Sequence, residues 1–520
     1  MILVTANQMQ QMDHNTITKF GIPGRVLMEN AGRGALETLV AHFDPIQDKR
    51  VAILIGRGNN GGDGFVIGRY LMEMGVAVRF FLLGNADRVS GDARANMTLV
   101  QTLLAEHPES EFLEISDAAA FYRCRTKLLH HDLMVDAILG TGLNADVRGY
   151  YRDVIETVNR SGIPVFSVDI PSGLDSDTGR VCGVAIQAEA TATFGFAKAG
   201  HVLYPGNLHT GDLEVIDIGI PGHIAMAQEP DLFLPEDEDV AALFSPRTFA
   251  SHKGSFGHAL ILAGSPGKTG AAALCANAAA RSGAGLVTLG LPEPLMPVVE
   301  PMVLAPMTAG LPATPGNALS ITGHRKILSL VADKNALALG PGMGTAPETE
   351  ELMAILVKDS PVPTVIDADG LNCLARDVSI LKQATAPMIL TPHPGEMARL
   401  TGTSTADIQA DRLGIARDFS RDHGVILVLK GAQTLVCCPD GAVFICPTGN
   451  PGMASGGMGD VLTGMITGFL SQGLSPESAA LAGAFIHGRC GDILAQATPV
   501  GFLAGDLIQT IPDALAEYLA

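Results

Sequence analysis

The chain has 520 residues, and its 54 acidic side chains outnumber its 34 basic ones to give a formal net charge of −20 at pH 7. This acidic balance argues against nucleic-acid and anionic-membrane partners, because both bind through clustered Lys and Arg, and leaves small molecules as the expected partners. A chain of this length is too long for one ordinary core and predicts two large domains.

The sequence carries no pattern typical of export or of a membrane span. Residues 1–20 lack a basic start followed by an apolar core and a small-residue cleavage site, and no uncharged run is both long and apolar enough to cross a bilayer. Eight cysteines lie between Cys124 and Cys490 without C-x-x-C spacing, which is typical of reduced thiols. We therefore expect a cytoplasmic protein.

Apolar runs of strand length alternate with helical patterns along the chain. The early runs are VAILI, VAVRFFLL, LMVDAIL and PVFSVDI, and the later ones are HALILAG, LVTLGL, ALALG, PTVIDAD, MILTP and VILVLKG. Such alternation predicts an α/β fold with mostly parallel sheets. The stretch 226–244 is rich in proline and acidic residues and has no sustained period, so we expect a linker there between domains at 1–225 and 245–520.

The first strand run leads into a glycine loop, VAILIGRGNNGGDGF, whose residues 56–61 match G-x-G-x-x-G. A dinucleotide loop of the usual kind needs an acidic residue about 20 positions further on, but the next strand ends in Gly84 and Asn85. A P-loop needs Lys and then Ser or Thr after the last glycine, and residues 63–65 supply neither. The loop can still offer amides to an anion ahead of a helix expected to begin near Gly64, or it can be only a tight turn.

A single carboxylate, Asp136, lies inside the otherwise apolar run LMVDAIL, where an unpaired charge is costly to bury. Asn60 and Ser172 are expected at the carboxyl ends of parallel strands, where ligands collect in open α/β sheets. Oxygen ligands with one negative charge suit a monovalent cation better than zinc, which prefers nitrogen and sulfur. The alternative is that Asp136 only accepts backbone hydrogen bonds from a nearby loop.

Asp169 ends the apolar run PVFSVDI and precedes a rigid turn, a position suited to general acid/base chemistry. With the segments LMENAGRGA, GRGNNGGDG, DAILGTGL and VDIPSGLDSDTG, residues 1–220 resemble the YjeF N-terminal domain, the NAD(P)HX epimerase. The resemblance implies a Rossmann-like three-layer domain that binds hydrated NAD(P)H, with Asp169 catalytic and a potassium ion held by Asn60, Asp136 and Ser172. The implied substrate contacts are Asn59, Asn60, Gly61, Gly62, Asp63, Gly140, Thr141, Gly142, Leu143, Asn144, Ala145, Asp146 and Asp169.

A second glycine-rich stretch, NPGMASGGMGDVLTG, runs from coil into a helix pattern. The amides of residues 456–459 would lie at the helix N-terminus, where developing negative charge is favoured. Asp460 at the same point can accept a proton from an attacking hydroxyl. The alternative is that Asp460 only caps the helix.

Together with SHKGSFGHALILAGS, GPGMG, DADGLN, TPHPGE and VLKGAQT, this stretch resembles the ribokinase-like domain of ADP-dependent NAD(P)HX dehydratase, from about residue 240 to 520. The resemblance implies nucleotide contacts from Lys430, Gly431, Ala432, Gln433, Thr434 and Gly459. It implies substrate contacts from Ala272, Gly342, Gly344, His393 and Asp460, with Asp460 catalytic. His393 can instead cap the following helix, and Glu396 can be only an acid that favours the helix dipole.

Both resemblances together imply a bifunctional repair enzyme. It would interconvert R- and S-NAD(P)HX and dehydrate the S form to NAD(P)H at the expense of ADP, giving AMP and phosphate, with K⁺ in the first domain and Mg²⁺ in the second. The expected partners are NAD(P)HX and ADP, with no nucleic acid and no membrane, and we expect a homo-oligomer. The alternative is a small-molecule kinase for a vitamin precursor or sugar, whose N-terminal domain only binds or acts as a scaffold. The acid cluster around Asp136 and Asp169 counts against a scaffold, which has no need of one.

Overall fold

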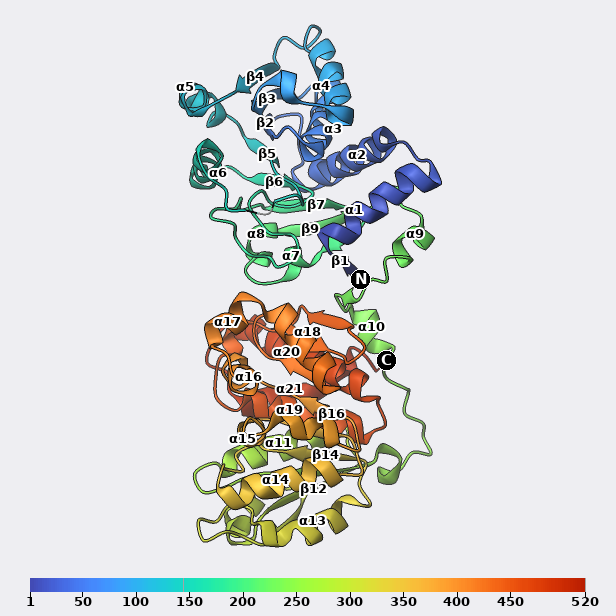
Figure 1. Ribbon diagram of the computed structural model, residues 1–520, viewed down its shortest axis with the longest axis vertical. Helices are drawn as coiled ribbons and strands as arrows, with labels where there is room; N and C mark the ends of the chain where they lie inside the picture. Colours follow the sequence, from blue (N-terminus) through green and yellow to red (C-terminus); the bar gives the residue numbers. More distant parts are fainter. Residues whose placement is uncertain (144, 520) are drawn as a thin grey trace. The chain divides into compact units, whose positions relative to one another are not determined.

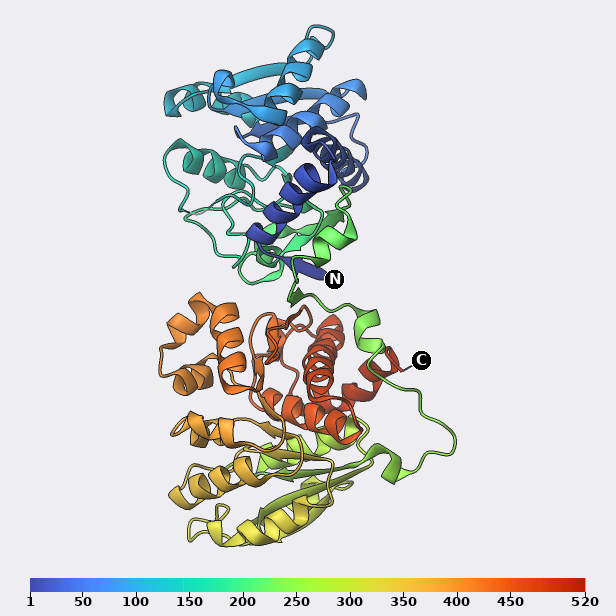
Figure 2. The same cartoon turned by 45° about the vertical axis from the view of Figure 1, so that its right-hand side comes forward.

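The computed structural model describes residues 1–143 and 145–519. The chain divides into two compact units: the N-terminal unit is Ile2–Leu232, and the C-terminal unit is the chain from Phe233 onward together with Met1. The division lies inside the stretch 226–244. In each unit, helices cover both faces of a central sheet (Figures 1 and 2). No helix in the described parts of the chain is long and apolar enough to cross a membrane.

The N-terminal unit contains a seven-stranded parallel sheet in the order β4-β3-β2-β5-β6-β7-β9. The strands are β2 (Arg50–Ile55), β3 (Ala77–Leu83), β4 (Glu111–Ile115), β5 (Leu133–Ala137), β6 (Val165–Val168), β7 (Ala190–Phe194) and β9 (Asp212–Ile216). A short parallel pair is formed by β1 (Ile2–Val4) and β8 (Ala197–Lys198). The strand order reverses between β2 and β5, and the carboxyl ends at such a reversal open a crevice in which ligands bind.

Two groups of helices cover this sheet, one on each face (Figure 1). One group is α2 (Gly24–His42), α3 (Asn59–Glu73) and α4 (Gly91–Leu103), and the other is α5 (Ala118–Leu128) and α6 (Tyr150–Ser161). Along β2, Val51, Ile53 and Ile55 pack with the first group, whereas Ala52 and Leu54 pack with the second. This alternation confirms the predicted three-layer α/β arrangement. The shorter helices are α1 (Ala6–Asn15), α7 (Ala199–Val202), α8 (Asn207–Thr210) and α9 (Gly222–Met226).

The helix after the first glycine loop begins at Asn59, so the prediction of a start near Gly64 is wrong. The physical reason is close packing of the first turn. A Cβ on Gly61 would lie 2.1 Å from the carbonyl oxygen of Gly56, and a Cβ on Gly64 would lie 2.6 Å from Cβ of Ala137. These glycines let the helix start directly against the strand ends instead of lengthening the loop.

The C-terminal unit contains strands in the order β13-β12-β11-β14-β15-β16-β17-β18-β19. They are β11 (His258–Leu262), β12 (Leu286–Pro292), β13 (Met307–Leu311), β14 (Ala336–Leu339), β15 (Thr364–Ile366), β16 (Met388–Leu390), β17 (Ile426–Leu429), β18 (Thr434–Cys437) and β19 (Val443–Cys446). Pairing is parallel from β13 to β17 and antiparallel through β18 and β19. The short strand β10 (Leu232–Phe233) spans the division between the units.

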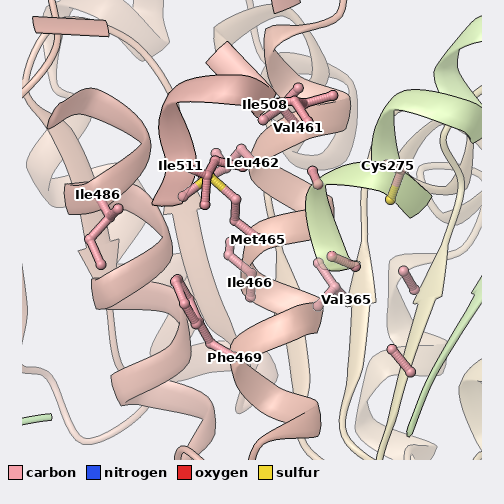
Figure 3. Packing of buried hydrophobic residues seen from close by; sticks show 14 of the residues in the cluster. Cys275, Val365, Val461, Leu462, Met465, Ile466, Phe469, Ile486, Ile508 and Ile511 are labelled. Atoms are coloured by element: carbon pink, nitrogen blue, oxygen red, sulfur yellow. The ribbon is translucent and has the colours of Figure 1, made fainter. Parts of the chain in front are cut away.

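One face of this sheet packs against α11 (Thr269–Arg281), α19 (Met458–Ser471), α20 (Pro476–Ala497) and α21 (Ala504–Ala516). Figure 3 shows Met465 and Phe469 of α19 gathered with Ile486 of α20 and Ile511 of α21. The remaining helices are α10 (Asp237–Ala241), α12 (Met296–Val299), α13 (His324–Val331), α14 (Pro347–Asp359), α15 (Asp369–Leu374), α16 (Pro394–Thr401), α17 (Thr405–Ala410) and α18 (Arg412–His423). Every apolar run that was predicted as a strand forms one. Strands β4, β7, β9 and β13 were missed; in EFLEI and ATATF, for example, polar residues interrupt the apolar pattern.

Candidate active sites

A cavity of about 610 Å³ lies at the carboxyl ends of β2, β5 and β6 in the N-terminal unit. The expected substrate contacts that line it are Asn59, Asn60, Asp63, Gly140, Thr141, Gly142, Leu143 and Asp169. Gly61 and Gly62 are buried in the first turn of α3. Ala145 and Asp146 are exposed and do not line this cavity, and Asn144 lies outside the described residues.

Asn60 is the least satisfied polar side chain at this cavity. It is 8% exposed, yet neither polar atom of its amide group has a hydrogen-bond partner among the described residues. An unpaired buried polar group costs about 1–3 kcal/mol, so a water, a ligand or an ion would complete this site. A Cβ on Gly140 would lie 3.3 Å from Cβ of Asn60 and 3.5 Å from Oδ2 of Asp169. Glycine at position 140 therefore lets Asn60 and Asp169 approach the same point.

Asp136 is fully buried in β5 and accepts four hydrogen bonds. Its Oδ2 accepts from the Ser172 amide at 2.8 Å and from Ser167 Oγ at 3.0 Å. Its Oδ1 accepts from Ser172 Oγ at 2.6 Å and from the Ile138 amide at 3.3 Å. Burial raises the pKa of Asp136, and the bonds from Ser172 oppose that shift. Two of the four donors are backbone amides, so the alternative that Asp136 accepts backbone hydrogen bonds from a nearby loop describes part of its environment.

The side chains of Asn60, Asp136 and Ser172 nevertheless have the chemistry that suits a potassium ion, although only Asp136 and Ser172 are in hydrogen-bond contact and only Asn60 lines the cavity. Asn60 offers an unpartnered carbonyl oxygen, and Asp136 and Ser172 add oxygen atoms with a single negative charge. Such a hard, all-oxygen set matches an alkali or alkaline-earth cation. Within residues 1–143 and 145–519, no group of three or more His, Cys, Asp or Glu side chains is arranged to hold a metal ion.

Asp169 follows β6 with a left-handed backbone conformation, φ 65°. Its Oδ1 accepts from Nζ of Lys198 at 2.7 Å and from Thr193 Oγ1 at 3.2 Å, and Lys198 itself is 1% exposed. Burial acting alone would raise the pKa of Asp169, but Lys198, together with His201 and Thr193, outweighs burial and holds that pKa below its ordinary value. Asp169 is therefore an ionised carboxylate on the cavity wall, as a general base must be.

Three further titratable residues at this site were missed from the sequence. Asp13 and Lys198 line the cavity, and Nε2 of His201 lies 2.9 Å from the carbonyl oxygen of Asp169. Burial raises the pKa of Asp13 to about 6. Burial and the charge of Asp169 together raise the pKa of Asp63 well above its ordinary value. A lone lysine in the apolar segment FGFAKAG was the signal for Lys198, whereas nothing local distinguishes Asp13 from a surface acid on a helix.

In the C-terminal unit, Asp460 lies in the first turn of α19. Gly457, with φ 94°, is the N-cap of this helix and no side chain caps it, so Asp460 is not the capping residue. Burial and then the charge of Asp367 raise the pKa of Asp460 to about 7. A carboxyl group with a pKa near neutrality can accept a proton and return it, which is the property expected of a catalytic base here.

Lys430 follows β17 and neutralises a buried carboxylate. Its Nζ donates to Oδ1 of Asp367 at 2.8 Å, and Oδ2 of Asp367 accepts from Thr463 Oγ1 at 2.8 Å. The same Nζ lies 3.8 Å from Oε2 of Glu396. A Cβ on Gly459 would lie 3.2 Å from Nζ of Lys430. Glycine at position 459 thus brings two expected nucleotide contacts together, and Asp367 is a buried charge that sequence reasoning left without a role.

Gly342 and Gly344 follow β14 with left-handed conformations, φ 61° and 82°. A Cβ on Gly342 would lie 2.7 Å from the carbonyl oxygen of Lys268, so the close approach requires glycine. The Gly344 amide donates to Oδ2 of Asp369 at 2.9 Å, and Nζ of Lys268 donates to the same oxygen at 2.8 Å. Ala272 is fully buried near the start of α11.

His393 is the N-cap of α16, as the simpler alternative expected. Its Nδ1 accepts from the amides of Gly395 at 3.0 Å and Glu396 at 3.3 Å. Oε2 of Glu396 accepts from the His393 amide at 2.8 Å, which completes a capping box. The side chain of His393 remains 52% exposed, so a capping role still leaves the imidazole accessible to a ligand.

Two family models match the chain. One is described as YjeF-related protein N-terminus and matches residues 24–200, and the other is described as NAD(P)H-hydrate dehydratase and matches residues 259–513. A protein of Moorella thermoacetica named bifunctional NAD(P)H-hydrate repair enzyme is 43% identical over 98% of this chain and 96% of its own length. A protein of the same name from Thermofilum pendens is 35% identical over 99% of this chain and 96% of its own length. A crystal structure of ADP/ATP-dependent NAD(P)H-hydrate dehydratase from Bacillus subtilis, co-crystallised with ATP and Mg²⁺, is 31% identical and covers 55% of this chain and 98% of that chain, with a TM-score of 0.48.

Proposed function

The chain belongs to the bifunctional NAD(P)H-hydrate repair enzymes, and we propose from that premise how its two units share the activity. The chain repairs hydrated nicotinamide dinucleotides. We assign the interconversion of R- and S-NAD(P)HX to a domain at residues 1–225. We assign the ADP-dependent dehydration of the S form to a domain at residues 245–520, with residues 226–244 as the linker.

In the N-terminal domain, Asp169 is the base of epimerisation. Inversion at C6 requires the hydroxyl to leave as water and water to add to the opposite face, so one group must deliver a proton and another must remove one. Asp169, held ionised by Lys198, removes the proton. Asp63, whose pKa is raised by burial, carries the proton that the departing oxygen takes. Two carboxyl groups with opposed pKa shifts at one cavity support this division of roles.

Potassium would be held by Asn60, Asp136 and Ser172. The ion would supply a fixed positive charge beside the cavity, which favours an anionic dinucleotide and satisfies the amide oxygen of Asn60. The proposed substrate contacts are residues 59–63 and 140–146, of which Asn59, Asn60, Asp63 and residues 140–143 line the cavity.

In the C-terminal domain, Asp460 takes the proton of the C6 hydroxyl while the hydroxyl oxygen attacks the β-phosphorus of ADP. A new O–P bond forms, the bond to the AMP oxygen breaks, and the glycine amides before α19 stabilise the transferring phosphoryl group. The C–O bond of the phosphorylated hydrate then breaks, phosphate leaves, and loss of the C5 proton regenerates NAD(P)H. The proposed nucleotide contacts are Lys430, Gly431, Ala432, Gln433, Thr434 and Gly459, and the proposed substrate contacts are Ala272, Gly342, Gly344, His393 and Asp460.

Magnesium would bind at this second site chiefly through the nucleotide. Mg²⁺ in phosphoryl-transfer sites usually keeps several waters and takes one or two carboxylates together with phosphate oxygens. The described residues offer no group of three acidic, His or Cys ligands, so phosphate oxygens would complete the coordination.

The position and pKa of Asp460 carry the proposal for the second site. The test is to incubate the purified chain with mixed NADHX epimers and ADP and to follow NADH absorbance. Complete recovery of NADH is expected, because the epimerase converts the R form into the substrate of the dehydratase. Recovery that stops when the S form is consumed would contradict the epimerase assignment, and a phosphorylated product without NADH would point to a kinase. Replacing ADP by ATP in the same assay tests the nucleotide preference.

We also propose a cytoplasmic location and a homo-oligomeric state. All eight cysteines are free thiols, and seven of them are buried, as suits a reducing compartment. Light scattering of the purified chain tests the oligomeric state.

A further inference from the structure

We propose that Arg412 is a positioning residue for the nucleotide. It gathers the carbonyl groups of Leu429, Lys430, Ala432 and Gln433 on one side of the loop and thereby turns the amides of Gly431 and Gln433 towards the phosphate oxygens. The inference rests on the nucleotide site proposed at residues 430–434. Arg412 lies outside the glycine and lysine motifs from which that site was predicted.

Arg412 begins α18, and its guanidinium lies against the loop that joins β17 to β18. Nη1 donates to the carbonyl oxygen of Ala432. Nη2 lies within hydrogen-bonding distance of three more carbonyl oxygens, at 3.2 Å for Leu429, 3.3 Å for Lys430 and 3.4 Å for Gln433. Four carbonyl groups of one short loop therefore converge on a single side chain.

The backbone of this loop is shaped for that convergence. Gly431 and Gln433 have φ values of 139° and 48°, so two left-handed residues flank Ala432. In the described part of the chain, none of the amides of residues 431–433 donates a hydrogen bond. Successive free amides in a turn of alternating hand form a concave site for anions. In a trans peptide the amide points away from the carbonyl group, so the Lys430 and Ala432 carbonyls that face Arg412 leave the amides of Gly431 and Gln433 to face a ligand.

The charge of Arg412 also favours an anion at this loop. No carboxylate of the described residues forms an ion pair with its guanidinium, and burial lowers the pKa of Arg412 to about 10, at which the side chain stays charged near neutral pH. Arg412 is half-buried, a position in which an unpaired charge is partly desolvated, and an anion across the loop offsets part of that cost. The neighbouring charge of Lys430 is already neutralised by Asp367.

The test compares Michaelis constants for ADP and for S-NADHX in three variants. Arg412→Met keeps the length of the side chain and removes the guanidinium, and we expect its KM for ADP to rise by ~10-fold or more while kcat changes by less than ~3-fold. Arg412→Lys keeps the charge without the planar group and is expected to raise this KM by a smaller factor. Arg421→Met removes an exposed arginine of the same helix and is the matched control with unchanged constants.

Equal KM values for ADP in Arg412→Met and Arg421→Met overturn the inference. A parallel rise in KM for ADP and for S-NADHX also overturns it, because a general loss of structure affects both substrates. If Arg412→Met fails to fold, as judged by thermal unfolding, Arg412→Lys decides the question, and a wild-type KM for ADP in that variant is the negative result. Calorimetric titration of the unaltered chain with ADP is the separate check on the proposed function, and absence of binding there defeats that function and not the role of Arg412 alone.

Discussion

Lys198 and Asp169 form a buried ion pair at the proposed epimerase site, with 2.7 Å between Nζ and Oδ1. Lys198 is almost fully buried, and its other bonds go to Thr193 Oγ1 at 2.8 Å and to the carbonyl oxygen of Phe194 at 3.2 Å. Removing one partner of a buried pair leaves the other charge without compensation. The ionisation of Asp169 therefore depends on Lys198 and not on solvent.

Lys198→Met should shift the acid limb of epimerisation to higher pH. Lys198 lowers the pKa of Asp169 against the effect of burial, so without it burial raises that pKa above the ordinary value. The ratio of variant to wild-type kcat/KM should then fall as pH decreases from 8 to 5, measured by chromatography of the two epimers. Asp169→Asn, which lacks the base, should be slower by ~100-fold at every pH. An unshifted acid limb in Lys198→Met would show that another group governs the ionisation of Asp169.

Asn60→Leu and Asp136→Ala should separate cation binding from structural support. Asp136→Ala leaves the Ser167 hydroxyl and the Ser172 amide without their acceptor and should lower the free energy of unfolding by about 1–3 kcal/mol. Asn60→Leu removes no hydrogen bond and should cost little stability. Both variants should lose the response of the epimerisation rate to added KCl, with the same ionic strength kept by a bulky organic cation. A wild-type KCl response in Asn60→Leu would rule out its amide oxygen as a ligand.

The sequence was enough to predict where the site residues lie relative to the parallel strands, but it was not enough to predict which distant segments come into contact. Asn60, Asp136 and Asp169 each lie in or just after an apolar run, and a parallel sheet brings such positions to one edge. That rule places the cavity. The pairing of Lys198 with Asp169 depends instead on the short strand β8, a two-residue element with no periodicity to detect.

The same limit applies in the C-terminal unit. The glycines before α19 and the carboxylate Asp460 were found because a glycine-rich coil running into a helix is a local pattern. Arg412 lies 18 residues before Lys430, in a helix with many charged side chains. Only the folded structure shows that Arg412 is the one that contacts the loop after β17. The start of α3 was misplaced for a related reason, since Gly61 reads as a loop residue until its contact with Gly56 is known.

Gly56→Ala and Gly58→Ala form a matched pair within the glycine motif. A Cβ at position 56 would lie 1.8 Å from the carbonyl oxygen of Ile138, whereas a Cβ at position 58 meets no atom within 4 Å. Gly56→Ala should therefore destabilise the N-terminal unit by ~2 kcal/mol or more, and Gly58→Ala should be tolerated. Thermal unfolding of both variants can be measured with loss of epimerisation activity as the readout. Equal melting temperatures for the two variants would show that the strand ends can move apart at no cost.

Asp460→Asn should separate the two activities of the chain. The substitution keeps the size of the side chain and removes the proton acceptor, so ADP-dependent recovery of NADH from S-NADHX should fall by ~100-fold or more. Binding of ADP, measured by calorimetry, should change much less, because the proposed nucleotide contacts lie at residues 430–434. Epimerisation should be unchanged, since its residues belong to the other compact unit. Wild-type recovery of NADH in this variant would contradict the role given to Asp460.

The same substitution should also change how stability depends on pH. The pKa of Asp460 is raised from 3.8 to about 7 in the folded chain, so the folded state binds the proton more tightly than the unfolded state. The stability contributed by this protonated carboxyl is present below about pH 4 and is lost as pH rises through about 7. The amide introduced by Asp460→Asn does not titrate, so the free energy of unfolding of the variant should rise relative to that of the wild type as pH increases from about 4 to about 7. At pH 8 the variant should be more stable by roughly 1–3 kcal/mol. Denaturant unfolding of both proteins at pH 4, 6 and 8 measures the difference in their free energies of unfolding. A difference that does not widen with pH would mean that Asp460 is already ionised at acidic pH and is not tuned by burial to act near neutrality.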